Sequence, residues 1–382
     1  MTNGDTPICR RSKLNEIFRN LRRFGWWFKR ICIIMRVSVR GGEILKNHMV
    51  LEPNPVQKLQ FNYSSDLYIV FKRLLESYPH QIATEKARKY CLSESPTRFE
   101  DAIARMEFLY MNDYLEDLER IIASEKLDKD LSFLYQLLLK RTEKKVTEED
   151  IEELVSISFD HPTLQCLSIF TLIYYNYDIN RFIVLDKYIE ACDKGIRMIN
   201  QPLIHYYFKL RYNELLFNHY WKTDNTLLAR RYAYKIINTE LSMKKSVMVH
   251  HNLSLTYVYD DYDSAMEQAL FALHLAEENE IKSQVVSLTQ RTIPFIAAFH
   301  EKAGHIVTPD KVETAHLSLA KKDFQKAREI LESLDALTPF QECYLGLATK
   351  DRALIKNSKE RFIHEYGDLF FARLPDYYLK RI

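Results

Sequence analysis

The residues best suited to metal chemistry in this 382-residue chain are His300 and His305, in the run HEKAGH. Zinc-protease helices carry two histidines four residues apart, so that both face one metal ion. A spacing of five places these side chains about 140° apart around an ideal helix, so they cannot share a metal ion there. The adjacent pair His250 and His251 is no better, since neighbouring side chains on a helix diverge.

Other patterns that could support catalysis are also incomplete. The run from Asp260 to Asp263 lacks the glycine and the distant glutamate of a calcium loop, and no GxSxG nucleophile motif occurs. We expect these aspartates to cap helices. The six cysteines form no CxxC pair, which is typical of idle thiols in a reducing cytoplasm. The sequence therefore predicts a cytoplasmic protein that is not an enzyme and binds no metal ion or cofactor.

The elements that carry these residues are expected to be helices. Only 8 glycines occur in the chain, and four of them fall in the first 42 residues. The remainder therefore has few glycine-dependent hairpin turns and no glycine-rich phosphate loop. From residue 64 onward, nearly every window shows the periodicity of an amphipathic helix. These features predict an all-α protein.

A repeated pattern of small residues indicates how the helices pack. Between Asp260 and Asn279, alanines recur at intervals of four, three and four residues and so share one helix face. A similar pattern precedes it by 36 residues, and a third begins near Ala327 without a strict period. This predicts a degenerate, tetratricopeptide-like superhelix of helical hairpins. The positions are Ala265, Ala269, Ala272 and Ala276, then Ala229, Ala233 and Ile236, then Ala327, Ile330, Leu331 and Leu334.

Aromatic residues are abundant, with 24 tyrosines and 21 phenylalanines. Runs such as Tyr174-Tyr175, Tyr206 to Phe208 and Tyr377-Tyr378 lie in helical context. A platform for nucleic-acid bases would need basic residues between the aromatic ones, which these runs mostly lack. We therefore expect the aromatic rings to fill the core between stacked helices.

The first 52 residues differ in charge from residues 53–382. Residues 1–50 hold 11 Lys/Arg and 3 Asp/Glu, whereas the rest of the chain is mildly acidic. A basic appendage of this kind fits a double-stranded DNA contact, and the candidate contact residues are Arg19, Arg22, Arg23, Lys29 and Arg30. The hypothesis for residues 1–52 is a DNA-binding headpiece, with a helix-turn-helix whose turn Gly25 or the Gly41-Gly42 pair would supply.

Three alternatives to a DNA-binding headpiece remain open. An apolar stripe that includes Phe18, Leu21 and Phe28 also suits a single long helix on a membrane surface or against a partner. The segment also fits a poorly ordered extension, or a misassigned start, since Met49 precedes the recognisable part. A transmembrane span is not expected, because Lys29 and Arg30 interrupt the apolar stretch, which is also too short.

Several segments resemble the AimR-like arbitrium receptors of Bacillus phages and prophages, collinearly from Pro53 to the end of the chain. They are LLESYPHQIATEKARKYCLS (Leu74 to Ser93), the segment from Leu215 to Ile237, LTYVYDDYDSA (Leu255 to Ala265), FQKAREILESL and the terminal DLFFARLP (Asp368 to Pro375). The resemblance implies a helix-turn-helix, a tetratricopeptide-like superhelix at 53–382, and a homodimer that involves the C-terminal region. It also implies control by a short signalling peptide of the choice between lysis and lysogeny. The alternative is a helical-repeat interaction scaffold or peptide receptor that does not bind DNA.

The same resemblance implies a set of peptide-contacting residues. The family's asparagine falls on Asn218, its basic contact on Lys244, and its two carboxylate contacts on Glu313 and Asp368. Asn252 stands where relatives have a threonine, and Leu255 and Val312 replace polar contacts. These departures indicate either a different peptide or a receptor that has lost its ligand. We expect Asn218, Lys244, Glu313 and Asp368 to converge on one concave surface that binds a peptide with a basic side chain and a free carboxylate.

The end of the chain is rich in large apolar side chains. An isolated chain end would expose them to water, so we expect them to form part of a homodimer interface. The residues are Phe370, Phe371, Leu374, Tyr377, Tyr378 and Leu379.

Overall fold

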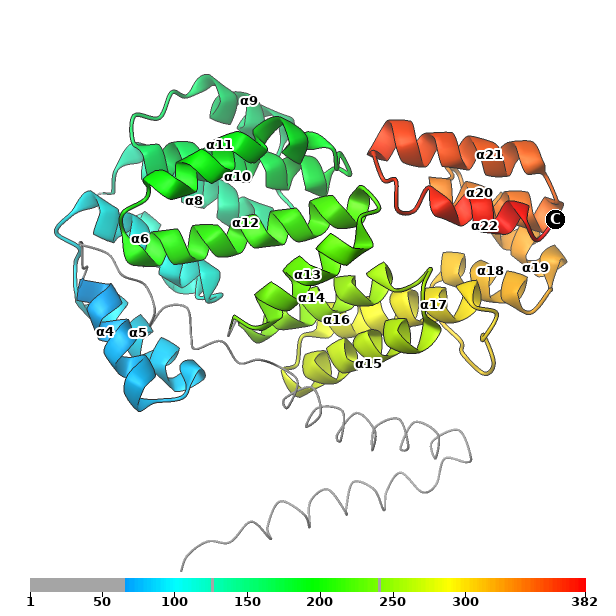
Figure 1. Cartoon of the computed structure of the whole chain (residues 1–382), viewed down its shortest axis with the longest axis horizontal. Coiled ribbons are helices and arrows are strands. Elements are labelled where there is room, and N and C mark those ends of the chain that lie inside the picture. Colours follow the sequence, from blue (N-terminus) through cyan, green and yellow to red (C-terminus); the bar gives the residue numbers. More distant parts are fainter. Residues whose placement is uncertain (1–65, 125–126, 240–241) are drawn as a thin grey trace, which may run out of the picture. The chain divides into compact units, whose positions relative to one another are not determined.

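The computed structural model describes residues 66–382 except for 125–126 and 240–241. Every regular element in the described part is helical, so the predicted all-α class is confirmed (Figure 1). The predicted basic contacts from Arg19 to Arg30 lie outside the described residues. The elements are α4 (Asp66–Ser77), α5 (His80–Ser93), α6 (Phe99–Met111), α7 (Leu115–Ser124), α8 (Lys129–Thr142), α9 (Glu148–Ser156), α10 (Pro162–Asp178), α11 (Val184–Met198), α12 (Pro202–Lys222), α13 (Thr226–Ile237), α14 (Met243–Thr256), α15 (Tyr262–Glu278), α16 (Lys282–Ser287), η2 (Leu288–Thr292), α17 (Ile293–Phe299), α18 (Lys311–Ala320), α19 (Phe324–Glu332), α20 (Pro339–Thr349), α21 (Arg352–Arg361), η3 (Phe362–Tyr366) and α22 (Arg373–Leu379).

The chain divides between Glu52 and Pro53, and all described residues belong to the second unit. No described helix is long and apolar enough to cross a membrane.

Short polar segments begin many of the helices. The side chain of Asp261 accepts hydrogen bonds from the backbone N–H groups of Asp263 and Ser264, so the expected capping role of this aspartate run is confirmed. Thr147 and Asp150 form a reciprocal capping box at the start of α9. These local bonds satisfy N–H groups that a helix terminus leaves without a partner within the helix.

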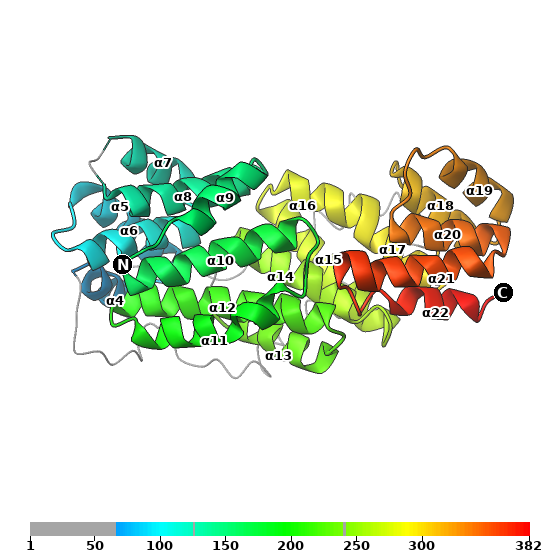
Figure 2. The ribbon, with the colours of Figure 1, turned by 90° about the horizontal axis from the view of Figure 1, so that it is seen from above.

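Helices adjacent in sequence pack as hairpins, notably α12 with α13, α14 with α15, and α20 with α21. Figure 2 shows α10, α11 and α12 side by side in the same manner. The alanine stripe of α15 is fully buried, as are Ala229, Ala233 and Ile236 of α13. The predicted repeat packing is confirmed, because small side chains on these faces let neighbouring helices approach closely.

The aromatic runs lie mainly in the core, as predicted. Tyr174, Tyr207 and Phe208 are buried, and the Phe170 and Phe208 rings meet edge to face with their centroids 5.4 Å apart. Aromatic rings of this size supply much of the apolar area that stacked helices bury.

A buried ion pair fixes α12 against α6. The guanidinium of Arg211 donates to both carboxylate oxygens of Glu107, over N–O distances of 2.6 and 3.0 Å. The Tyr135 hydroxyl, from α8, donates to the same carboxylate at 2.7 Å. Three elements are thus connected through one fully buried polar group, which orients the long helix that carries the candidate site.

Candidate functional site

The candidate site is built on a polar stripe along α12. Glu214, Asn218 and Lys222 are spaced four residues apart, so they lie on one face of the helix. Asn218 is half-buried in the middle of this stripe, and its Nδ2 donates to the Glu214 carbonyl at 3.1 Å. The stripe therefore places Asn218 between an acidic and a basic side chain.

The acidic end of the stripe contacts α14. The Lys245 ammonium lies 3.3 Å from a carboxylate oxygen of Glu214, and both side chains are largely shielded from water. Lys244, the predicted basic contact, is the neighbouring residue and is exposed. Asn252 lies two turns further along α14 and is half-buried. α14 thus contacts the stripe at Glu214 through Lys245, and not through Lys244.

The basic end of the stripe contacts the C-terminal segment, residues 367–382. The Lys222 ammonium donates to Asp368 Oδ2 at 2.6 Å, and the other carboxylate oxygen of Asp368 accepts from the Phe371 N–H at 3.0 Å. Asp368 is 3% exposed. Its carboxylate is therefore part of an internal ion pair that holds the chain end against α12, one helical turn from Asn218.

Glu313 is also buried, in the first turn of α18. Burial raises the pKa of this carboxyl group, and a hydrogen bond with His316 opposes that rise. The His316 ring stacks on Tyr344 at 4.2 Å and hydrogen bonds through its other nitrogen to the Tyr378 hydroxyl. Glu313 is thus joined to the aromatic cluster at the end of the chain.

Two buried tyrosines lie near enough to the carboxylates of Glu313 and Asp368 to feel their charge. Burial raises the pKa of Tyr259 well above its usual value, and the nearby Asp368 carboxylate raises it further. Burial likewise raises the pKa of Tyr344, with a further contribution from Glu313. Asn218 thus lies one helical turn from Lys222, which binds Asp368, and Glu313 is joined to Tyr344 through His316. The convergence of Asn218, Lys244, Glu313 and Asp368 on one concave surface stays a prediction.

The predicted dimer residues do not stand exposed at the chain end. Phe370, Phe371, Leu374 and Tyr378 are buried inside their own chain, and Tyr377 and Leu379 are half-buried. Rings from α12, α17 and α20, together with Tyr259, pack against this segment. The premise that this end would expose its aromatic side chains is therefore wrong. A dimer contact there stays a prediction, and it would depend on outward residues such as Leu369.

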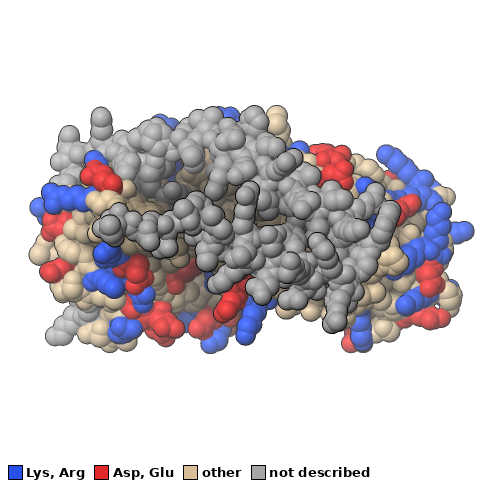
Figure 3. All heavy atoms as spheres, turned by 90° about the horizontal axis from the view of Figure 1, so that it is seen from below, with Lys and Arg blue, Asp and Glu red and all other residues tan. Residues whose placement is uncertain are grey.

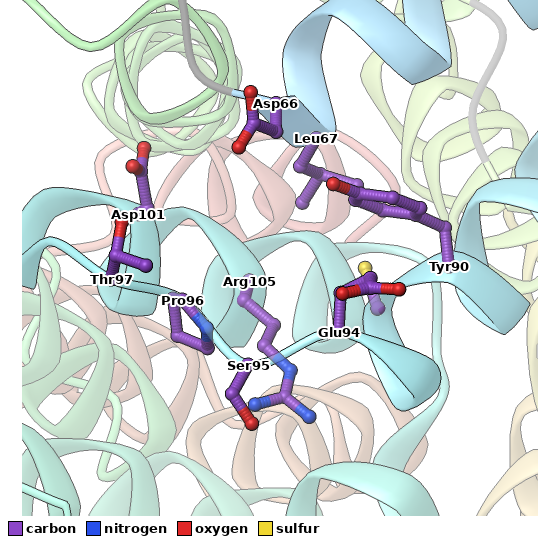
Figure 4. Close-up of a pocket in the computed structure, with 10 residues that line it drawn as sticks. Asp66, Leu67, Tyr90, Glu94, Ser95, Pro96, Thr97, Asp101 and Arg105 are labelled. Carbon is purple, nitrogen blue, oxygen red and sulfur yellow. The ribbon is translucent and has the colours of Figure 1, made fainter.

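Two of the cavities in the described part of the chain lie away from this region. The first, between α4, α5 and α6, measures about 50 Å³ and has Arg105 and Asp101 in its wall (Figure 4). That volume holds one or two water molecules and is too small for a peptide. The second, beside α9 and the end of α10, measures about 600 Å³ and is lined by residues such as Glu152 and Arg181. None of the five predicted peptide contacts lines either cavity.

Metal and thiol chemistry find little support in the described part of the chain. No group of three or more His, Cys, Asp or Glu residues there is arranged to hold a metal ion. The four described cysteines are free and buried, and burial raises the pKa of Cys91, Cys192 and Cys343 to about 12. Thiols with such pKa values are weak nucleophiles near neutral pH.

A family model described as AimR transcriptional regulator-like matches residues 83–381. The chain belongs to this family. The predicted AimR-like resemblance is thereby confirmed over most of the chain, including all of α12, α14 and the C-terminal segment.

Individual relatives support the AimR-like assignment. An uncharacterized protein of Bacillus anthracis is 25% identical over 261 residues, which are 64% of this chain and 89% of the relative. The solved structure of phAimR-Ligand matches with a TM-score of 0.67 and 18% identity, over 84% of this chain and 98% of its own. That of SeMet-phAimR matches with a TM-score of 0.59 and 17% identity, over 90% and 96%. At these identities the solved structures show a shared fold.

Sequence reasoning missed three residues that organise this AimR-like site, namely Glu214, Lys222 and Lys245. The four-residue spacing of Glu214, Asn218 and Lys222 is visible in the sequence and could have indicated a polar face on an otherwise buried helix. Their partners could not be read from it, since Lys222 and Asp368 lie 146 positions apart.

Proposed function

We propose that this AimR-like protein is a cytoplasmic, peptide-responsive transcription regulator of phage or prophage origin that controls lysis and lysogeny. The observation that carries the proposal is the partly buried polar stripe of α12, joined to Asp368 within the matched part of the chain. A peptide's amides and charged ends are strongly hydrated, so a receptor must replace that water with hydrogen bonds and opposite charges. Asn218 supplies an amide beside both signs of charge.

The DNA-binding part of the proposal rests on the family's description and on charge. The excess of basic residues among the first 50 supports phosphate contacts, with Arg19, Arg22, Arg23, Lys29 and Arg30 as candidates. On the uncovered part of the face in Figure 3, basic and acidic side chains are interspersed over the described helices. A mixed surface of this kind offers less attraction to DNA than the N-terminal segment does.

We also propose a homodimer, in which outward side chains of the C-terminal segment take part. The alternative function, a helical-repeat scaffold or peptide receptor without DNA binding, fits the same fold. Both functions share the peptide site and differ only in the role of residues 1–52.

The test combines peptide and DNA binding on the full-length chain. Calorimetric titration with the synthetic peptide encoded beside this gene should show binding, and that peptide should change the retardation of upstream phage DNA in gels. Asn218→Ala should weaken peptide binding by about 1–2 kcal/mol, since it removes a side-chain amide that hydrogen bonds to the bound peptide.

Asn279→Ala is the matched control for Asn218→Ala. Asn279 is exposed at the end of α15 and makes the same kind of bond, from Nδ2 to the carbonyl four residues earlier at 2.8 Å. This variant should bind the peptide as the parent chain does. Equal losses in both variants would remove Asn218 from the site, and peptide binding without any DNA binding would favour the scaffold alternative.

A further inference from the structure

The ammonium group of Lys222 lies in a box of three aromatic rings closed by a carboxylate. Its Nζ is 4.5 Å from the ring centroid of Phe182, 4.2 Å from that of Trp221 and 4.8 Å from that of Phe371. Asp368 Oδ2 lies 2.6 Å away. The side chain of Lys222 is 11% exposed and that of Asp368 is 4% exposed. The cation is thus almost completely surrounded by groups that attract it.

Backbone hydrogen bonds hold the walls of this ammonium box in place. The Phe182 N–H donates to the Tyr366 carbonyl at 3.2 Å, which joins the loop before α11 to the C-terminal segment. The Lys222 carbonyl accepts from the N–H groups of Leu369 and Phe370, at 2.8 and 3.3 Å. None of these bonds uses the lysine ammonium. These backbone bonds therefore hold the walls of the box together in addition to the ion pair.

Aromatic faces and a carboxylate form the arrangement that proteins use to bind external ammonium groups. A buried ion pair is seldom the most stable filling for such a space, because the desolvation of both ions offsets most of their attraction. A well-packed apolar residue would stabilise the same contact at least as well. The charged filling also gives the box the chemistry of an ammonium-binding site.

We propose that the ammonium box is a binding site for a primary alkylammonium group, and that Lys222 occupies it as an internal ligand. Resting on the proposed function, the second part is that a peptide's lysine side chain or free amino terminus pairs with Asp368 only by displacing Lys222. Asn218 lies one turn from the box, so the same peptide can reach both groups. A ligand's ammonium group can then enter the box only if it binds there more strongly than Lys222 does.

The test removes the Lys222 ammonium from the full-length protein by mutation and supplies a small ammonium ion in its place. Lys222→Ala removes three methylene groups and the ammonium, which together have the size of n-propylammonium. We expect the variant's Tm to fall by about 10 °C, since Asp368 is left buried and unpaired. Propylammonium chloride should restore about half of that loss or more, whereas uncharged n-propanol should not.

Three comparisons make the refilling specific. The double variant Lys222→Ala, Asp368→Asn should show no recovery with propylammonium, because the carboxylate is gone. Lys245→Ala is the matched control, since Lys245 is equally shielded and faces Glu214 at 3.3 Å and the Met111 sulfur. With propylammonium, Lys245→Ala should regain a far smaller share of its lost Tm. Propylguanidinium distinguishes a lysine-like from an arginine-like ligand, and recovery with propylguanidinium alone would overturn the ammonium assignment.

Equal recovery with propanol, or none with propylammonium, would also overturn the proposal. If Lys222→Ala does not fold, reductive methylation of the unaltered chain provides the test: Lys222 should resist labelling while exposed Lys244 is labelled, and rapid labelling of Lys222 would reject the box. None of these measurements uses the peptide. A failed peptide titration would therefore overturn the displacement step and leave the ammonium site standing.

Discussion

Glu107 and Arg211 illustrate what an interior charge requires of its neighbours. Both side chains are at most 2% exposed, and the carboxylate accepts from Arg211 and from Tyr135. In the interior, the attraction within such a pair mainly offsets the cost of removing two ions from water. The pair is therefore sensitive to the loss of one partner more than to the loss of both.

Arg211→Met should destabilise the chain by about 3–5 kcal/mol, because Glu107 would remain buried without its cation. Urea unfolding followed by circular dichroism measures this change. The double variant Arg211→Met, Glu107→Gln should recover part of the loss. Arg328→Met is the control, since Arg328 and Glu332 form a pair that is about half exposed, and its effect should stay within about 0.5 kcal/mol. A comparable loss in both single variants would contradict this account.

Parts of the site could be predicted at this scale and parts could not. The resemblance pointed to Asn218 and Asp368, and in the structure Asp368 binds Lys222, which lies one helical turn from Asn218. What the sequence could not supply was the state of Asp368, because an internal partner 146 residues away is a product of tertiary packing. For the same reason, the sequence could not show that the large side chains from Phe370 to Leu379, expected to be covered by a second copy of the chain, are covered largely by their own chain.

Among the helices, features set by neighbouring residues were predictable and features set by contacts between helices were not. The alanine stripe of α15 and the Asp261 cap depend on residues within a few positions. The π-helical turn η2 joins α16 to α17 and η3 extends the end of α21, and no local signal in the sequence indicated either turn. η3 ends at Tyr366, and Gly367, in the left-handed region, joins it to Asp368, so the position of that carboxylate depends on an irregular turn.

The close packing of α20 on α21 gives a test at the scale of the helix. A Cβ atom on Gly346 would lie 2.5 Å from Ile355 Cγ1, 3.0 Å from the Ile355 nitrogen and 3.1 Å from the Asp351 carbonyl oxygen. Alanine normally stabilises a helix relative to glycine. Here Gly346→Ala should destabilise the chain by about 1–3 kcal/mol, because backbone atoms of α21 would have to move.

Thermal unfolding of Gly346→Ala beside Gly195→Ala checks the cause. A Cβ on Gly195 would meet only Cys166, with side-chain atoms at 3.0 and 3.1 Å and the backbone at 3.9 Å. The Cys166 sulfur can rotate away, and no atom lies as close as the 2.5 Å contact at Gly346, so this control should lose less stability. A neutral or stabilising Gly346→Ala would mean that the two helices can separate freely.

For the described chain as a whole, buried histidines make stability depend on pH. Burial lowers the pKa of five of them from the usual 6.5, although several accept or donate hydrogen bonds in the interior. His251, for example, bonds through one nitrogen to Gln284 at 3.1 Å and through the other to Thr292 at 2.6 Å. The five are His205, His219, His250, His251 and His300.

The unfolded chain takes up protons at these histidines near pH 6.5, whereas the folded chain does so only at lower pH. Their contribution to stability is therefore present above pH 6.5 and is lost as the pH falls toward the folded pKa values. For each extra proton that the unfolded state binds, the free energy of unfolding falls by about 1.4 kcal/mol for every unit by which the pH is lowered. Glu313 acts in the opposite direction, since its pKa is raised from 4.5, so the interval from about pH 7.5 to 5.5 reports mainly on the histidines.

Urea unfolding at several pH values across that interval should give a free energy of unfolding that falls steadily with acidification. His251→Gln cannot be protonated, so it should flatten this dependence, and the amide can still reach Gln284 or Thr292. His274→Gln makes the same change at a side chain that is 54% exposed, and it should leave the slope unaltered. A slope that is unchanged in His251→Gln would mean that this ring is already protonated in the folded chain or is equally solvated in both states. A free energy that rises on acidification would assign the pH dependence to Glu313 and the other carboxyl groups instead.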